Sequence, residues 1–169
     1  AVELDVTGER TPVPALEGHR RADLLLPNDG LRSYAMVRLD DTSLTTMREH
    51  LGAIRDPLTR AHAWFTAWDL LRDALLPAHQ YVALVADHAR VEHDADLLRT
   101  LVARALRAAA RFGSPRRRAE SEELLARAAR DAFAASEPGS DEQLVWARCR
   151  ISVDDPEWAL GLLDGTVRP

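Results

Sequence analysis

The sequence predicts a mainly α-helical protein, in which antiparallel helical hairpins stack as an α-superhelix behind a short β segment. From residue 41 onward, apolar residues recur with the spacing of a helix face. A capping residue followed by proline, a typical helix start, stands at 56–57, 114–115 and 155–156. Alternation of apolar and polar residues, typical of strands, is confined to the first forty residues.

The β segment is predicted to contain about three strands. VELDV at residues 2–6 and YAMVRL at 34–39 alternate, and ADLLLP at 22–27 is a short apolar run. Asn28-Asp29-Gly30 favours a turn before the last strand, because Asn and Gly tolerate a positive φ. In the alternating segment 34–39, Ala35, Val37 and Leu39 share one face. We therefore place a boundary between residues 1–40 and 41–169.

Seven helices are predicted beyond this boundary. They lie near residues 43–53, 56–75, 77–92, 95–112, 116–136, 141–152 and 156–164. Ser140 and Gln143 have the spacing of a capping box, and Gly113 and Gly165 fit helix C-termini. Because the connections are short, neighbouring helices are expected to pack antiparallel.

The helix at 56–75 could be a site or part of the core. Its apolar face holds Ala61, Trp64, Phe65, Trp68, Leu71 and Leu75. His62, Thr66, Asp69 and Asp73 form a narrow polar stripe, which we expect to be the one wet edge of a buried helix. Two other interpretations remain: the Trp pair lines a ligand pocket, or His62, Asp69 and Asp73 bind a metal, although the stripe lacks a helical His pair.

Composition excludes some functions. The formal net charge is -5, and all 22 basic residues are arginine, a bias that suggests a high-GC bacterial genome. An acidic balance argues against nucleic-acid binding, and no stretch reaches the ~20 apolar residues of a membrane span. Arg116 to Arg118 precede Glu120, Glu122 and Glu123, which indicates a solvated helix start. Cys149 is alone, so an internal disulfide is impossible and a buried core thiol is expected.

No catalytic constellation is apparent. None of the six histidines belongs to an H-E-x-x-H motif, and the spacing of His88, Glu92 and His93 favours a surface pair. There is no glycine-rich phosphate loop and no G-x-S-x-G elbow. The pairs Asp40-Asp41 and Asp154-Asp155 are explained by helix capping. We therefore predict no catalytic, cofactor-binding or metal-binding residue in this chain.

Two stretches resemble a known family. LLLPNDGLRSYAMVRLD, residues 24–40, resembles the end of the β-sandwich domain in zinc aminopeptidases of the aminopeptidase N family. Residues 56–86 resemble the first long helices of that family's C-terminal helical domain in its actinobacterial form. The matching positions are Asp56, Trp68-Asp69, Arg72-Asp73, Leu76-Pro77 and Tyr81-Val82. GSDEQLVWAR, residues 139–148, is similar to a later helix of the family.

The resemblance implies an excised piece of a larger enzyme. Residues 1–40 would end the β-sandwich domain, and residues 41–169 would be the front part of a truncated helical domain that helps to enclose the active-site chamber. The zinc motif and the G-x-M-E-N substrate loop would belong to an earlier domain, so zinc is a cofactor of the parent enzyme and not of this chain. The chain opens on Ala1, not methionine, and closes on LLDGTVRP, as expected for such a piece.

The resemblance also implies partners. These are the catalytic and β-sandwich domains of the same polypeptide and the parent's peptide substrates, in the bacterial cytoplasm, without nucleic acid or membrane. Cut edges would let the fragment self-associate through its strands or through Trp158, Leu160, Leu162 and Leu163. The alternative is a free-standing helical-repeat interaction module, against which the strand-like first forty residues argue.

Overall fold

The computed structural model describes residues 2–153 and 156–166, and these are mainly helical. Within the described residues seven α-helices form: α1 (Asp41–His50), α2 (Pro57–Arg72), α3 (Ala78–His88), α4 (Ala95–Arg111), α5 (Pro115–Ala135), α6 (Asp141–Val153) and α7 (Pro156–Asp164). Short 3-10 turns lie at η1 (Pro14–Leu16), η2 (Asp29–Leu31), η3 (Leu51–Ala53) and η4 (Ala89–Val91). The seven predicted helices are thus confirmed, with ends that differ by a few residues.

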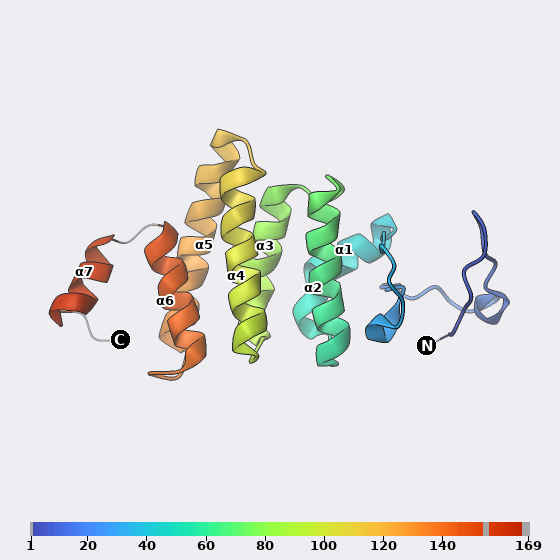
Figure 1. Ribbon diagram of the computed structural model, residues 1–169, viewed down its shortest axis with the longest axis horizontal. Helices are drawn as coiled ribbons and strands as arrows, with labels where there is room; N and C mark the ends of the chain where they lie inside the picture. Colours follow the sequence, from blue (N-terminus) through green and yellow to red (C-terminus); the bar gives the residue numbers. More distant parts are fainter. Residues whose placement is uncertain (1, 154–155, 167–169) are drawn as a thin grey trace.

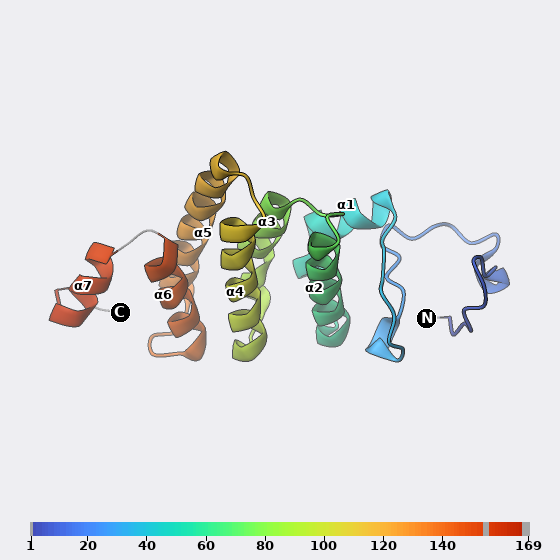
Figure 2. The same cartoon turned by 45° about the horizontal axis from the view of Figure 1, so that its top comes forward.

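The helices are arranged in two rows along the long axis of the molecule (Figure 1). In one row α1 contacts α3 and α3 contacts α5, while in the other α2 contacts α4 and α4 contacts α6. From α2 to α6, consecutive helices run in alternating directions, and α3 with α4 and α5 with α6 form contacting pairs. Figure 2 shows residues 2–40, which we call the N-terminal segment, at one end of the rows and α7 at the other.

Side-chain caps fix where most helices begin. Each of four caps accepts a bond from the backbone N–H three residues later: Asp40 from Ser43 (3.0 Å), Asp56 from Thr59 (2.7 Å), Asp94 from Leu97 (2.7 Å) and Ser114 from Arg117 (3.4 Å). Ser140 accepts from the N–H of Gln143 (3.1 Å), whose side chain returns to the N–H of Gly139 (2.8 Å). Asp154 and the predicted cap Asp155 lie outside the described residues.

The core runs between the two rows. Trp64 is completely buried and Trp68 is 8% exposed, which confirms that they are packing residues. Phe65 and Leu75, predicted on the same apolar face, are 37% and 44% exposed, and Leu75 lies beyond the end of α2. Trp68 contacts Tyr81 of α3 and Phe112 at the end of α4, with ring centroids 5.4 and 6.1 Å apart. Farther along, buried alanines allow close approach of α4 and α5, among them Ala105, Ala108, Ala109, Ala126 and Ala129.

The contacts of α7 correct one prediction. Trp158 was expected on an exposed face, but it is 8% exposed. Its ring meets Phe133 of α5 edge-on at 5.1 Å, and the Arg150 guanidinium lies 4.0 Å from its centroid. Leu160 and Leu163 are exposed, as predicted, while Leu162 is half-buried. The apolar surface of α7 is therefore smaller than its sequence indicates, because one of its largest side chains packs inward.

The three predicted strands at 2–6, 22–27 and 34–39 do not form among the described residues. A strand needs a neighbour to pair its backbone, and no described segment offers one to these residues. The alternation still sorts the side chains from residue 36 onward: Val37 is buried and Leu39 half-buried, whereas Met36 and Arg38 are exposed. Ala35, predicted on the packed face, is exposed, as is Tyr34. The sequence pattern therefore marks an extended segment with one packed face, and the packing partner is the helical array.

Candidate functional site

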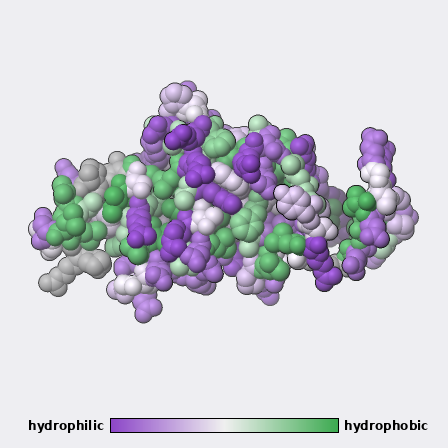
Figure 3. Space-filling model, viewed as in Figure 1, coloured by the Kyte–Doolittle hydropathy of each residue, from purple (hydrophilic) through white to green (hydrophobic). Residues whose placement is uncertain are grey.

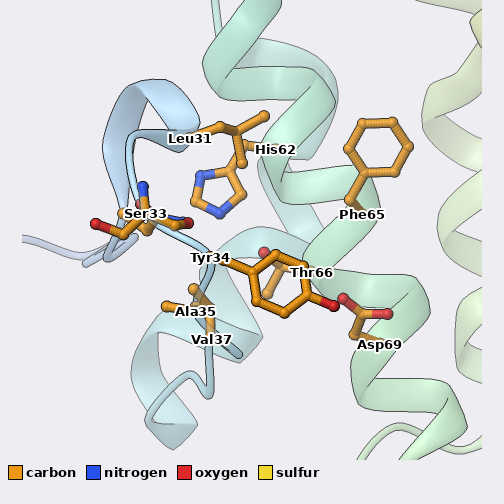
Figure 4. Close-up of a pocket in the computed structure, with 10 residues that line it drawn as sticks. Leu31, Ser33, Tyr34, Ala35, Val37, His62, Phe65, Thr66 and Asp69 are labelled. Carbon is orange, nitrogen blue, oxygen red and sulfur yellow. The ribbon is translucent and has the colours of Figure 1, made fainter.

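A hollow lies between the extended N-terminal segment and α2 (Figure 4). It has a volume of about 250 Å³. Its lining comes from the segment (Asn28, Leu31, Ser33, Tyr34, Ala35 and Val37) and from α2 (His62, Phe65, Thr66 and Asp69). It is the place where the segment and the polar stripe of α2 meet.

The turn predicted at 28–30 shapes this hollow. Asn28 takes a left-handed conformation with φ of 62°, and Gly30 follows with φ of 75°. The Asn28 side chain donates to the Ser33 carbonyl (2.8 Å) and accepts from the Ser33 N–H (3.0 Å). These two bonds close the turn, so that the residues after Ser33 run along α2.

The polar stripe on α2 is not fully exposed to solvent, as its sequence suggests it should be. His62 and Thr66 are both 3% exposed, because the segment covers them, and only Asp69 and Asp73 reach solvent. Asp73 pairs with Arg38 of the segment at 3.6 Å. The metal interpretation finds no support: among the described residues, no three His, Cys, Asp or Glu side chains gather to hold an ion. The polar stripe of α2 instead packs against the N-terminal segment.

A second group of hydrogen bonds, centred on Ser43, holds the N-terminal segment against α1. The buried Ser43 hydroxyl accepts from the Leu25 N–H (3.0 Å) and donates to Asp40 (3.0 Å), which also pairs with Arg21. The bond from the Ser43 N–H lowers the pKa of Asp40, and the Ser43 hydroxyl and Arg21 act in the same direction. Residues 21–40 are thus attached to the helices at both ends.

Glu92 is a buried carboxylate that the sequence pattern did not reveal. It is 3% exposed and accepts from Arg60 Nε (2.6 Å), Arg60 Nη2 (3.0 Å) and Trp64 Nε1 (2.7 Å). Arg60 also donates to the Ile54 carbonyl (2.8 Å), and the bonds to Glu92 raise the pKa of Arg60. With three N–H donors on its oxygens, Glu92 is a structural joint between α2 and η4.

The expectation of a surface pair formed by His88 and His93 around Glu92 is therefore wrong. The three side chains point to different partners: His88 Nε2 lies 2.9 Å from the Arg48 carbonyl, and His93 Nδ1 lies 3.0 Å from Glu142. Periodicity could not show this, because Glu92 follows a 3-10 turn and its partner Arg60 is thirty-two residues away. A lone acidic residue beside apolar turn residues was the only available signal.

The remaining reactive groups are also structural. Cys149 is buried as predicted, and burial raises the pKa of its thiol to about 12, so it is not poised as a nucleophile. Arg116, Arg117 and Arg118 pair with glutamates of their own helix, which confirms the solvated helix start. No helix within the described part of the chain combines the length and apolarity that a membrane crossing requires.

The fold and these contacts define a two-row helical array whose polar groups join one element to the next. The chain belongs to the ERAP1-like C-terminal domain family, whose model matches residues 24–155. It is also 42% identical over 166 residues to a protein of Streptomyces lividans described as aminopeptidase N. That similarity covers 96% of this chain and 19% of the relative, so the chain spans about a fifth of the relative's length. The family resemblance seen in the sequence is confirmed.

Proposed function

We propose that this chain is a non-catalytic helical domain of a zinc aminopeptidase, an enzyme that removes N-terminal residues from peptides. One observation carries the proposal, namely the similarity to aminopeptidase N over 96% of the chain. In the intact polypeptide the array would help to enclose the active-site chamber and limit which peptides enter. The contacts described above suit that role, because they hold helices and segment in a fixed arrangement.

The parent's zinc does not fit the described residues of this chain. Structural and catalytic zinc sites take three or four closely spaced Cys, His or acidic ligands, and no such group is present in the described part. We therefore assign no catalytic, cofactor-binding or metal-binding residue and no reaction step to this chain. Peptide hydrolysis would depend on residues elsewhere in the polypeptide.

We propose further that residues 1–40 end a β-sandwich domain and that residues 41–169 begin an α-superhelix. Exposed Tyr34 and Met36 and the extended backbone of 34–39 support the first part, since a neighbouring strand would pair that backbone and cover those side chains. The two-row stacking of α1 to α6 supports the second. The partners would be the catalytic and β-sandwich domains of the same chain, and the location the bacterial cytoplasm.

Metal analysis and an aminoacyl-anilide assay test the proposal. The 169-residue chain should contain no stoichiometric zinc and show no turnover above blank, whereas the intact polypeptide from the same reading frame should show both. An H-E-x-x-H motif should lie upstream in that frame. Turnover or stoichiometric zinc in the isolated chain would contradict the non-catalytic role.

The alternative is a free-standing helical-repeat interaction module, which the two-row array by itself also favours. A reading frame that encodes no H-E-x-x-H motif, together with an intact product inactive on aminoacyl-anilides, would favour that alternative.

A further inference from the structure

Three arginines on one face of α4, of which two are exposed and one is half-buried, have no carboxylate partner in the described part of the chain. Arg104, Arg107 and Arg111 are spaced so that they share one face of the helix. All five arginines of α5 lie within salt-bridge distance of a glutamate, and Arg99, five residues before Arg104, pairs with Asp96. This face of α4 therefore carries positive charge that no described carboxylate neutralises, in a chain with a net charge of -5.

A hollow lies at the C-terminal end of this arginine face. A shallow depression of about 430 Å³ is lined by Arg107, Arg111 and Phe112. Phe112 is 47% exposed, so part of its ring offers an apolar surface in a hollow that two arginines also line. Figure 3 shows hydrophilic side chains along α4 on the face of the molecule viewed there.

Aromatic packing holds the hollow in place. The Phe112 ring meets Trp68 edge-on at 6.1 Å, which ties the end of α4 to α2. The Arg104 guanidinium lies 5.2 Å from the ring centroids of both Phe65 and Trp68, a cation–π arrangement that fixes its position.

Arg104 also leaves hydrogen-bonding capacity unused. Its Nη1 atom is buried without an acceptor among the described residues. The Tyr81 hydroxyl lies beside it without reaching hydrogen-bond geometry; burial raises the pKa of Tyr81, and the Arg104 charge opposes that rise. The positive charge of Arg104 therefore adds to that of the two exposed arginines beside the hollow.

We propose that this hollow binds a carboxylate carried on an aromatic group. A carboxylate is the natural partner of guanidinium groups, which can hold both of its oxygens, and a flat ring can stack on Phe112. Because the hollow is open and small, binding should be about millimolar for a ligand of about ten heavy atoms. No residue that lines the hollow has a role in the proposed function, so the proposal does not rest on it.

Phenylacetate is the probe, and amide signals of the nitrogen-15-labelled 169-residue chain are the readout. We expect saturable shifts at the Trp68 indole N–H and at residues around Phe112. Phenylacetamide, which lacks the charge, and acetate, which lacks the ring, should bind several-fold more weakly. Arg111→Gln should weaken phenylacetate binding about fivefold, the effect of losing one exposed ion pair. Arg99→Gln is the matched control, with the same charge change on the same helix.

Four results would overturn the proposal. They are an absence of saturable shifts up to about 100 mM phenylacetate, equal binding of the amide, equal binding of acetate, or equal weakening by Arg111→Gln and Arg99→Gln. Because Arg111 is exposed, its replacement should leave the fold intact, which the unchanged remainder of the spectrum verifies.

Discussion

At the scale of single residues, Trp64 combines complete burial of its ring with a hydrogen bond to Glu92. Trp64→Ala removes a fully buried ring and should cost about 3–5 kcal/mol of unfolding free energy. Trp64→Phe keeps most of the packing but removes the N–H that bonds Glu92, and should cost about 1.5–3 kcal/mol. Urea denaturation followed by circular dichroism measures both losses.

Trp68 provides the control for this prediction. It is also buried, but its described contacts are with rings and with Arg104. Trp68→Phe should therefore cost less than Trp64→Phe, while Trp68→Ala should again cost about 3–5 kcal/mol. Equal losses for the two Phe variants would show that the bond to Glu92 contributes little. A loss under about 1 kcal/mol for either alanine variant would contradict its burial.

Cys149 allows a second test at this scale. With a thiol pKa of about 12, almost none of the reactive thiolate is present at neutral or mildly alkaline pH, and the side chain is also buried. Reaction with a thiol reagent such as Ellman's reagent should be at least about a hundredfold slower in the folded chain than in urea. Similar rates in the two conditions would mean that Cys149 is accessible in the folded state.

At the scale of elements, Ser43 decides whether the N-terminal segment stays on α1. Ser43→Ala removes the acceptor of the Leu25 N–H and one partner of Asp40, at a cost of about 0.5–1.5 kcal/mol. Hydrogen exchange of the Leu25 amide should become faster, while amides in the middle of α4 should not change. Thr42→Ala, an exposed change on the same helix, is the control and should leave Leu25 unaffected.

The start of α2 should depend on pH through Asp56. The backbone bond from Thr59 lowers the pKa of Asp56 below its ordinary value of 3.8. Because the folded value lies below the unfolded one, the contribution is complete above pH 3.8 and is lost as the pH falls through the folded pKa. Asp56→Ala should destabilise the chain at neutral pH, and its difference from wild type should shrink in acid.

Urea melts of wild type, Asp56→Ala and Asp56→Asn at neutral pH and near pH 3 measure this dependence. The asparagine variant is the control, since its neutral side chain can still cap the helix at both values. A difference between wild type and Asp56→Ala that is constant over this range would contradict an ionised cap.

At the scale of the whole molecule, two exposed apolar surfaces should make the chain self-associate. One is the extended segment 34–39, whose backbone is unpaired among the described residues and whose Tyr34 and Met36 face solvent. The other is α7, where Leu160 and Leu163 are 62% and 85% exposed. Sedimentation over a concentration series should show a dimer or larger species whose share rises with concentration.

Paired substitutions separate the two routes. Leu160→Gln with Leu163→Gln tests α7, and Tyr34→Lys with Met36→Lys tests the segment. Leu144→Gln, which changes an exposed leucine of α6 outside both surfaces, is the control. A wild-type chain that remains monomeric at high concentration would show that neither surface drives association.

The sequence by itself determined the features that depend on near neighbours. Caps such as Asp56 and Ser114 with their following prolines, the turn at Asn28 to Gly30, and the apolar face around Trp64 act over one or two helical turns. Their chemistry is complete within a short stretch, so the positions of the helices and of that turn could be predicted. The family resemblance also lay in such local motifs.

Only the tertiary structure decided the features whose partners are distant in the chain. Glu92 turns inward because Arg60 and Trp64 reach it from α2, and His62 and Thr66 are buried because the segment near Ser33 crosses them. The strands expected at 2–6, 22–27 and 34–39 do not form among the described residues, since a strand requires a pairing neighbour as well as a pattern. The residue types set the free energy that burial of a polar side chain would cost, and the free energy that pairing of an alternating segment would contribute. Which of these outcomes occurs depends on what packs against it.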